Sequence, residues 1–123
     1  MHYDNGQLWQ EVPFLGEQIH GTMREWYDNA VLAFEIPMCR GLRHGVCKQW
    51  DECGRLLGSY EMDMGTGISK RWHSNGKLQF EAHMTRDVFD GFCRMWDTEG
   101  RLKRESLFAN GKEIARQNLQ HSP

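Results

Sequence analysis

Apolar and polar residues alternate along most of this chain, in runs of about five or six residues separated by turn-forming segments. Alternation with a period of two is typical of β-strands that bury one face. The runs come in pairs, and the segment that joins each pair is rich in Asn, Gly, Asp and Ser, as in β-hairpins. The pattern therefore predicts an all-β protein made of consecutive hairpins.

One hairpin unit repeats along the sequence. Four blocks align without a gap, each with a Gly five residues before a Trp and a Leu six residues after it. The blocks are centred on Trp26, Trp50, Trp72 and Trp96, which are 24, 22 and 24 residues apart. A shorter copy, YDNGQL, opens the chain. A fixed period of this kind is characteristic of repeat architectures.

The repeats define the expected domain organisation. At 123 residues the chain is long enough for one domain. We expect a single repeat domain over residues 1–112, followed by a polar C-terminal tail or a short capping helix over residues 113–123. Within the domain we expect a half unit and four full units, which span residues 1–20, 21–44, 45–66, 67–90 and 91–112.

The turn between the two strands of a unit allows two pairings. A two-residue Asn-Gly loop places Trp72 opposite Gln79, whereas a three-residue loop at 74–76 with a left-handed Gly places Trp72 opposite Leu78. We favour the three-residue loop because it collects apolar residues on one face. Ala30 replaces this Gly in the first full unit. A left-handed Ala costs roughly 1 kcal/mol, so we expect that turn to relax to another type.

Strict alternation along the paired strands then assigns the two faces of the sheet. The favoured pairing places Lys70 opposite Phe80 and Ile68 opposite Ala82. One face is therefore expected to be apolar and to carry the basic residues that lie two positions before each Trp, and the other to carry the glutamates that lie nine residues after each Trp. These glutamates are Glu35, Glu81 and Glu105, with Glu11 in the half unit and Ser59 as the exception. Consecutive hairpins predict an antiparallel meander that forms an elongated, twisted single sheet.

The repeated pattern G-x-x-K-x-W-x-x-x-G-x-L-x-x-E, with a His-Gly pair in the linking turn, resembles MORN (membrane occupation and recognition nexus) repeats. It is most similar to the bacterial variant found in antitoxin or immunity proteins. The resemblance covers residues 3–112. It implies a stack of hairpins in a curved sheet that binds or scaffolds a partner and has no catalytic centre. Some members of the family are linked to phospholipids.

Candidate partner-binding residues are the four tryptophans and the basic residue two positions before each of them. The complete set is Arg24, Trp26, Lys48, Trp50, Lys70, Trp72, Arg94 and Trp96. The basic residues form a ladder of cations that suits an acidic segment, or else their stems pack on cross-strand neighbours while their charged ends reach water. The tryptophans are either repeat-core residues or partly exposed binding anchors.

Composition and motifs exclude several other classes of function. The net charge of −2, from 15 basic and 17 acidic residues, gives no basic surface for nucleic acid. The histidines and cysteines lack metal-ligand spacing, and no phosphate-binding loop is present, so we expect neither a metal nor a cofactor. The repeated glutamates do not form a single active site, and we expect no catalytic residues and no enzyme activity. The four cysteines are expected to be free thiols.

The first functional hypothesis is therefore a protein-protein interaction module. Its resemblance implies an antitoxin or immunity protein that neutralises a toxin or effector. The alternatives are a lipid-associated scaffold that contacts anionic head groups, and a structural module that assembles with a second copy as a homodimer. The chain has no signal-peptide pattern at its start and no apolar run of about 18 residues, which predicts a soluble cytoplasmic protein.

Overall fold

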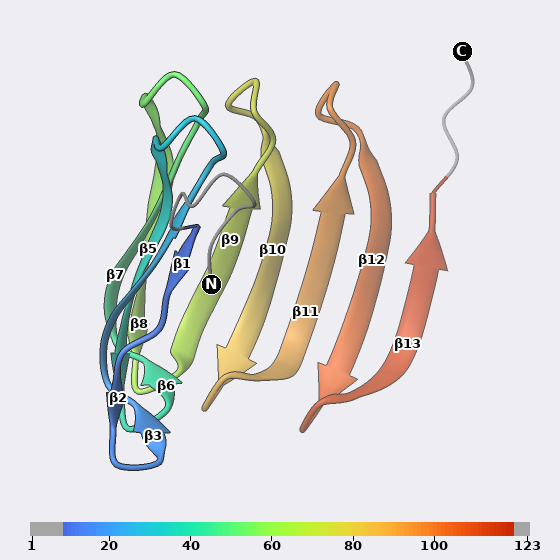
Figure 1. Ribbon diagram of the computed structural model, residues 1–123. Coiled ribbons are helices and arrows are strands. Elements are labelled where there is room, and N and C mark those ends of the chain that lie inside the picture. Colours follow the sequence, from blue (N-terminus) through green and yellow to red (C-terminus); the bar gives the residue numbers. More distant parts are fainter. Residues whose placement is uncertain (1–8, 120–123) are drawn as a thin grey trace.

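The computed structural model describes residues 9–119, which form strands and turns and contain no helix (Figure 1). The strands, in chain order, are β1 (Gln10–Glu11), β2 (Phe14–Leu15), β3 (Gln18–Ile19), β4 (Gly21–Trp26), β5 (Leu32–Cys39), β6 (Leu42–Arg43), β7 (Gly45–Trp50), β8 (Leu56–Asp63), β9 (Thr66–Trp72), β10 (Leu78–Thr85), β11 (Val88–Trp96), β12 (Leu102–Ala109) and β13 (Lys112–Asn118).

One large antiparallel sheet dominates the molecule. Its strand order is β1-β4-β5-β7-β8-β9-β10-β11-β12-β13, and β6 adds a short pairing to β5. The strands β2 and β3 form a separate small hairpin. Apart from β2 and β3, sheet order follows chain order, and the end strands β1 and β13 do not pair with each other. The predicted all-β meander of repeated hairpins is confirmed.

The pairing of Trp with Leu is confirmed in all four full units. The Gly that closes each three-residue loop is left-handed, as at Gly76, where φ is 88°. Ala30 keeps the same conformation, with φ at 69°. The expectation that this turn relaxes to another type is therefore wrong, because the hairpin around it fixes the loop geometry.

Beyond the Trp–Leu pair, the register differs from the expected one. The return strand contains a bulge immediately after the Leu, so Gln79 adds one residue and shifts the alternation that follows. Phe80 consequently lies opposite Arg71, and Lys70 lies opposite Glu81. The expected pairs of Lys70 with Phe80 and of Ile68 with Ala82 are wrong. The expected separation of cations and glutamates onto different faces is wrong for the same reason.

The sheet is strongly curved. The ladder between β8 and β9 has only two aligned pairs, as does the ladder between β5 and β7, whereas β7 and β8 share six. In Figure 1 the strands β5, β7 and β8 overlap in projection, while β9 to β13 spread out towards the right of the view. Short ladders between hairpins allow this bending. The core lies on the concave face and consists of Cys47, Met62, Ala82, Met84 and Cys93.

The C-terminal segment is a strand. Residues 112–118 form β13, which pairs with β12 along its length. The prediction of a polar tail or short capping helix over 113–123 is therefore wrong for this stretch, and its last four residues, 120–123, lie outside the described part. An open edge of β12 would leave backbone N–H and C=O groups unpaired, and β13 satisfies them.

Candidate interaction surfaces

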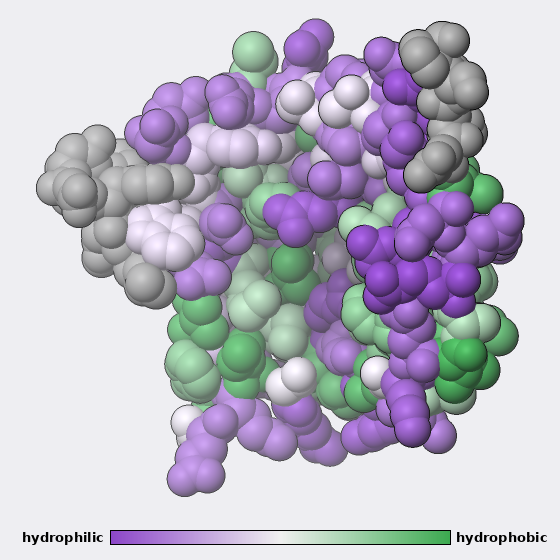
Figure 2. All heavy atoms as spheres, turned by 90° about the vertical axis from the view of Figure 1, so that its right-hand side faces the viewer, coloured by the Kyte–Doolittle hydropathy of each residue, from purple (hydrophilic) through white to green (hydrophobic). Residues whose placement is uncertain are grey.

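The concave face contains a hollow of about 530 Å³. Figure 2 views the molecule from the β13 side and shows apolar side chains gathered in the middle and lower part of this face, with polar ones along its rims. Strands from β4 to β11 contribute to the hollow, which is consistent with the strong curvature of the sheet. The residues that line the hollow include Glu25, Phe34, Arg43, Tyr60, Arg71 and Phe80.

Arg43 holds one end of the hollow together. Its Nε lies 2.6 Å from Asp87 Oδ1, and its Nη1 donates to Tyr60 Oη and to Ser69 Oγ, each at 2.9 Å. The Arg43 backbone N–H also donates to Asp87, at 2.7 Å. Burial alone lowers the pKa of Arg43, but Tyr60 and Asp87 outweigh this effect and raise it above its ordinary value. The charge of Arg43 is therefore used within the fold.

Arg71 carries a second positive charge in the hollow. Its guanidinium carbon lies 4.9 Å from the centre of the Phe34 ring, a cation–π contact between β9 and β5. These strands are separated by β7 and β8 in the sheet, so the contact requires the sheet to curl. Arg71 is exposed and forms no ion pair with any residue in 9–119. Its charge is therefore available to a ligand.

The wall between the second and third hairpins is built by Gln49, Gly58 and Trp72. The buried Gln49 amide accepts the Trp72 N–H at 3.0 Å and donates to the Trp72 carbonyl at 2.9 Å. The Trp72 ring lies against Gly58, where a Cβ atom would be 2.3 Å from the nearest ring atoms. Trp72 thus packs between two neighbouring hairpins, which agrees with the prediction that it is a repeat-core residue.

The predicted basic residues lie on the convex face, in one row with the glutamates. Cross-strand neighbours in this row alternate in charge except at Ser59, which lies between Lys48 and Lys70. Arg94 lies 2.8 Å from Glu105 and 3.6 Å from Glu81, and Arg24 lies 3.3 Å from Glu35. The ladder is therefore one of alternating charges. The candidate residues Arg24, Lys48, Lys70 and Arg94 therefore face cross-strand neighbours of this row. The four tryptophans are all partly exposed.

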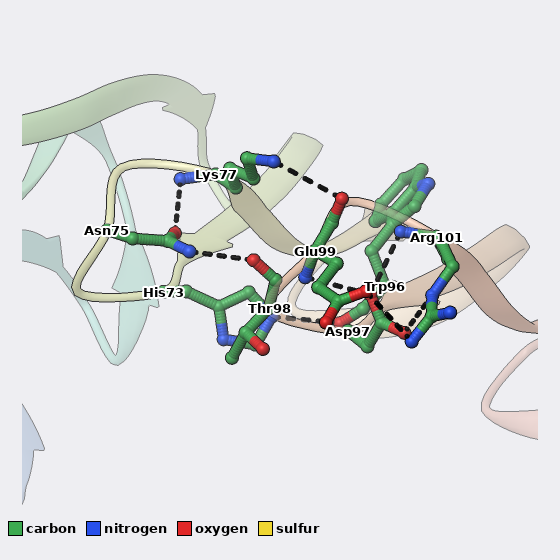
Figure 3. Close-up of polar contacts among 8 residues, drawn as sticks. All are labelled: His73, Asn75, Lys77, Trp96, Asp97, Thr98, Glu99 and Arg101. Carbon is green, nitrogen blue, oxygen red and sulfur yellow. Dashed lines mark hydrogen bonds and ion pairs between the residues drawn. The ribbon is translucent and has the colours of Figure 1, made fainter. Parts of the chain in front are cut away.

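The turns at the Trp end link the hairpins in pairs. Figure 3 shows that Asn75 donates to the Thr98 carbonyl at 2.7 Å and that His73 Nε2 contacts the Trp96 carbonyl at 2.9 Å. Tyr27 and Asn29 make the equivalent contacts from the first full unit to the second. The turn-to-turn contacts thus follow a double repeat, and the sequence signal was visible in Asn29 and Asn75.

The turns of the second and fourth units are built differently. In these turns an Asp side chain folds back on its own loop. Asp97 accepts the backbone N–H groups of Glu99 and Arg101, and the Arg101 side chain adds an ion pair at 2.9 Å. The hydrogen bond from the Arg101 backbone is the largest of the effects that lower the pKa of Asp97 to about 2.

The histidines and cysteines have structural environments. His44 Nδ1 accepts the Met64 N–H at 3.0 Å, and His20 caps the preceding turn in the same way. Burial raises the pKa of the Cys47 and Cys93 thiols, and all four cysteines are free. Among the described residues, no group of three or more His, Cys, Asp or Glu side chains is placed to hold a metal ion.

The residues that line the hollow occupy positions where the repeats differ from one another. The position before each Trp holds Glu25, Gln49, Arg71 and Met95, and the position eight after each Trp holds Phe34, Gly58, Phe80 and Arg104. Sequence reasoning missed these residues because it followed the constant positions of the repeat. Their variation at equivalent sites was the signal that could have found them.

Comparison with known proteins gives one family match. A family model described as a MORN repeat variant matches residues 1–15 and 66–85. A search of curated proteins gives no match. No helix in the described residues has the length and apolar character needed to cross a membrane. The second matched stretch contains β9, β10 and their turn, and the same hairpin recurs in the other full units. The match and the repeated geometry together support a MORN-repeat protein.

Proposed function

We propose that this chain is a non-catalytic protein-binding module whose concave hollow holds a segment of its partner. MORN repeats are generally modules for interaction with proteins or lipids. The observation that carries the proposal is the hollow itself, where the Arg71 guanidinium, which forms no ion pair within residues 9–119, lies beside aromatic rings. Aromatic and arginine side chains in partly enclosed sites supply much of the binding energy in protein interfaces.

The chemistry of the hollow defines the partner segment. Phe34 and Phe80 offer apolar surface, and Arg71 offers a cation that already lies over the Phe34 ring. A partner carboxylate can pair with Arg71 while an adjacent apolar or aromatic side chain packs on the rings. We therefore infer that the bound segment carries an acidic residue next to a large apolar one.

A protein partner fits the charges better than a lipid surface. The cations of the convex face are interleaved with glutamates, so this face offers no continuous positive strip to anionic head groups. The hollow is concave and contains Glu25 as well as Arg71. A flat anionic membrane cannot enter such a site without approaching that carboxylate.

We further propose that the partner is an enzyme that the module neutralises, as an antitoxin or immunity protein does. A binding module without catalytic chemistry can block an enzyme by covering its active site. This role comes from the resemblance of the repeats, and the shape of the hollow is compatible with it. Neighbouring genes that encode a toxin or effector would support this role. It would be supported further if such a toxin inhibits growth in cells whose module carries a substitution of Arg71, but not in cells with the wild-type module.

The proposed binding mode is tested by affinity capture from native cells. The variant Arg71→Glu reverses the available charge of the hollow, and Lys103→Glu reverses an exposed charge on β12 as the matched control. We expect wild type and Lys103→Glu to retain the same partner, and Arg71→Glu to lose it while its circular dichroism spectrum is unchanged. Equal capture by all three proteins would contradict the proposal.

A further inference from the structure

The charged row of the convex face is interrupted at one position. From β1 to β12, cross-strand neighbours in the row are Glu11, Arg24, Glu35, Lys48, Ser59, Lys70, Glu81, Arg94 and Glu105. Ser59 on β8 lies opposite Lys48 on β7. On the other side of β8, Met62 pairs with Gly67 of β9, and the same register continued by three residues places Lys70 beside Ser59. Every other position between two cations of the row holds a glutamate. The row therefore lacks one negative charge at Ser59.

The two lysines beside Ser59 have unused pairing capacity. Lys48 forms no ion pair with any residue of the described part of the chain, although Glu35 is its cross-strand neighbour. Lys70 lies 4.0 Å from Glu81, and that carboxylate is shared with Arg94 at 3.6 Å. Strands two apart in a sheet are about 9.5–10 Å from each other, so two ammonium groups on long stems can converge on one anion above Ser59.

Apolar side chains lie beside this gap on the same face. Val46 and Ile68 each lie two residues before a lysine of the gap, and they are 43% and 39% exposed. They offer apolar surface beside the two lysines, so a ligand at the gap can make apolar contacts as well as charge contacts.

The surrounding charges restrict the ligand to a single anionic group. Glu35 is the outer neighbour of Lys48 in the row, and Glu81 is the outer neighbour of Lys70. Glu61 lies opposite Val46 on β8. These carboxylates repel an extended polyanion, such as nucleic acid or an anionic membrane. They leave room for one carboxylate on an otherwise neutral segment. A second copy packed face to face in register would place like charges against each other.

We propose that the Ser59 gap is a second docking point, where Lys48 and Lys70 bind one Asp or Glu side chain of a protein partner and Val46 and Ile68 contact the apolar residue next to it. The exposed Ser59 hydroxyl can donate a hydrogen bond to the same carboxylate. Lys48 and Lys70 also border the hollow, whereas Ser59, Val46 and Ile68 do not. Alternation along the strands places the Ser59 gap on the convex face. It therefore goes beyond the proposed function, and its failure would leave the hollow unaffected.

The test uses two substitutions of the same size at Ser59. Ser59→Glu supplies the missing charge from within the fold, and Ser59→Gln is the matched neutral control. A random peptide display library is selected on the wild-type protein. Peptides are kept only if Arg71→Glu leaves their binding unchanged, which removes those that use the hollow. Each remaining acidic peptide is then synthesised with its carboxylate and with the corresponding amide.

We expect the selected peptides to carry one isolated acidic residue beside an apolar one. Replacing the peptide carboxylate by an amide, or Ser59 by Glu, should weaken binding about tenfold, because each change removes a charge-assisted contact. Ser59→Gln should change affinity by less than about threefold. The proposal is wrong if no acidic peptide passes the selection, or if Ser59→Glu and Ser59→Gln bind equally well. Binding of phosphatidylserine vesicles that Ser59→Glu abolishes would overturn it in favour of a membrane.

Discussion

The replacement Gly58→Ala tests the packing that forms the wall of the hollow. A Cβ atom at this position would lie 2.3 Å from two atoms of the Trp72 ring and 2.7 Å from a third. The indole cannot flex away as a long side chain can, and the buried Gln49 amide holds the Trp72 backbone in place. The ring must therefore move as a unit. Overpacking of this kind costs about 1–3 kcal/mol.

The expected sign is opposite to that of an ordinary substitution. Gly58 is not left-handed, and Ala in a strand is normally more stable than Gly by about 0.5–1 kcal/mol. Urea unfolding followed by far-ultraviolet circular dichroism measures the difference. In a Trp72→Ala background the clash is absent, so Gly58→Ala should be neutral or stabilising there. A Gly58→Ala protein as stable as wild type, with Trp72 present, would refute this reasoning.

Three further predictions concern the turns and the thiols. Ala30→Gly should stabilise the protein by about 1 kcal/mol in urea unfolding, because φ at this residue is 69°; no gain would mean that the turn is unstrained. The pKa of Asp97 is about 2 in the folded state, below its ordinary value of 3.8, so its stabilising effect is present above the higher value and is lost as pH falls through the lower one. Asp97→Asn should therefore melt earlier than wild type at pH 7, and this difference should shrink as pH falls from 3.8 through about 2; a constant difference would contradict this. Iodoacetamide should label the exposed Cys53 first and the buried Cys47 and Cys93 only on unfolding, as mass spectrometry can show, and equal labelling rates would rule out their burial.

The fold could be predicted from the sequence because its determinants are local and repeated. The Gly, Trp and Leu positions specify a three-residue loop, and the loop fixes the Trp–Leu pair in every unit. The assignment of faces could not be predicted, because a single bulge residue after the Leu inverts it. Each basic residue is followed 11 positions later by a glutamate in three of the four units. This spacing is compatible with cross-strand ion pairs and equally with charges on two separate faces.

The curvature and the hollow depend on contacts that no periodicity encodes. Arg43 reaches Asp87 across strands that are far apart in sequence, and Arg71 reaches Phe34 across two intervening strands. The C-terminal strand was also missed, because its polar residues give no alternation and it forms by pairing with the edge of β12. In a repeat protein the constant positions build the scaffold, while the variable ones give the surface its individual chemistry.

Site-specific photocrosslinking in native cells shows whether the concave hollow binds a protein. A benzophenone amino acid is placed at Phe34, which lines the hollow, or at Leu15, which is 68% exposed on the separate β2–β3 hairpin. We expect the photocrosslinker at position 34 to give a crosslinked protein partner and the photocrosslinker at position 15 to give none. Crosslinking from position 15 alone, or the absence of a protein product at position 34, would contradict this expectation.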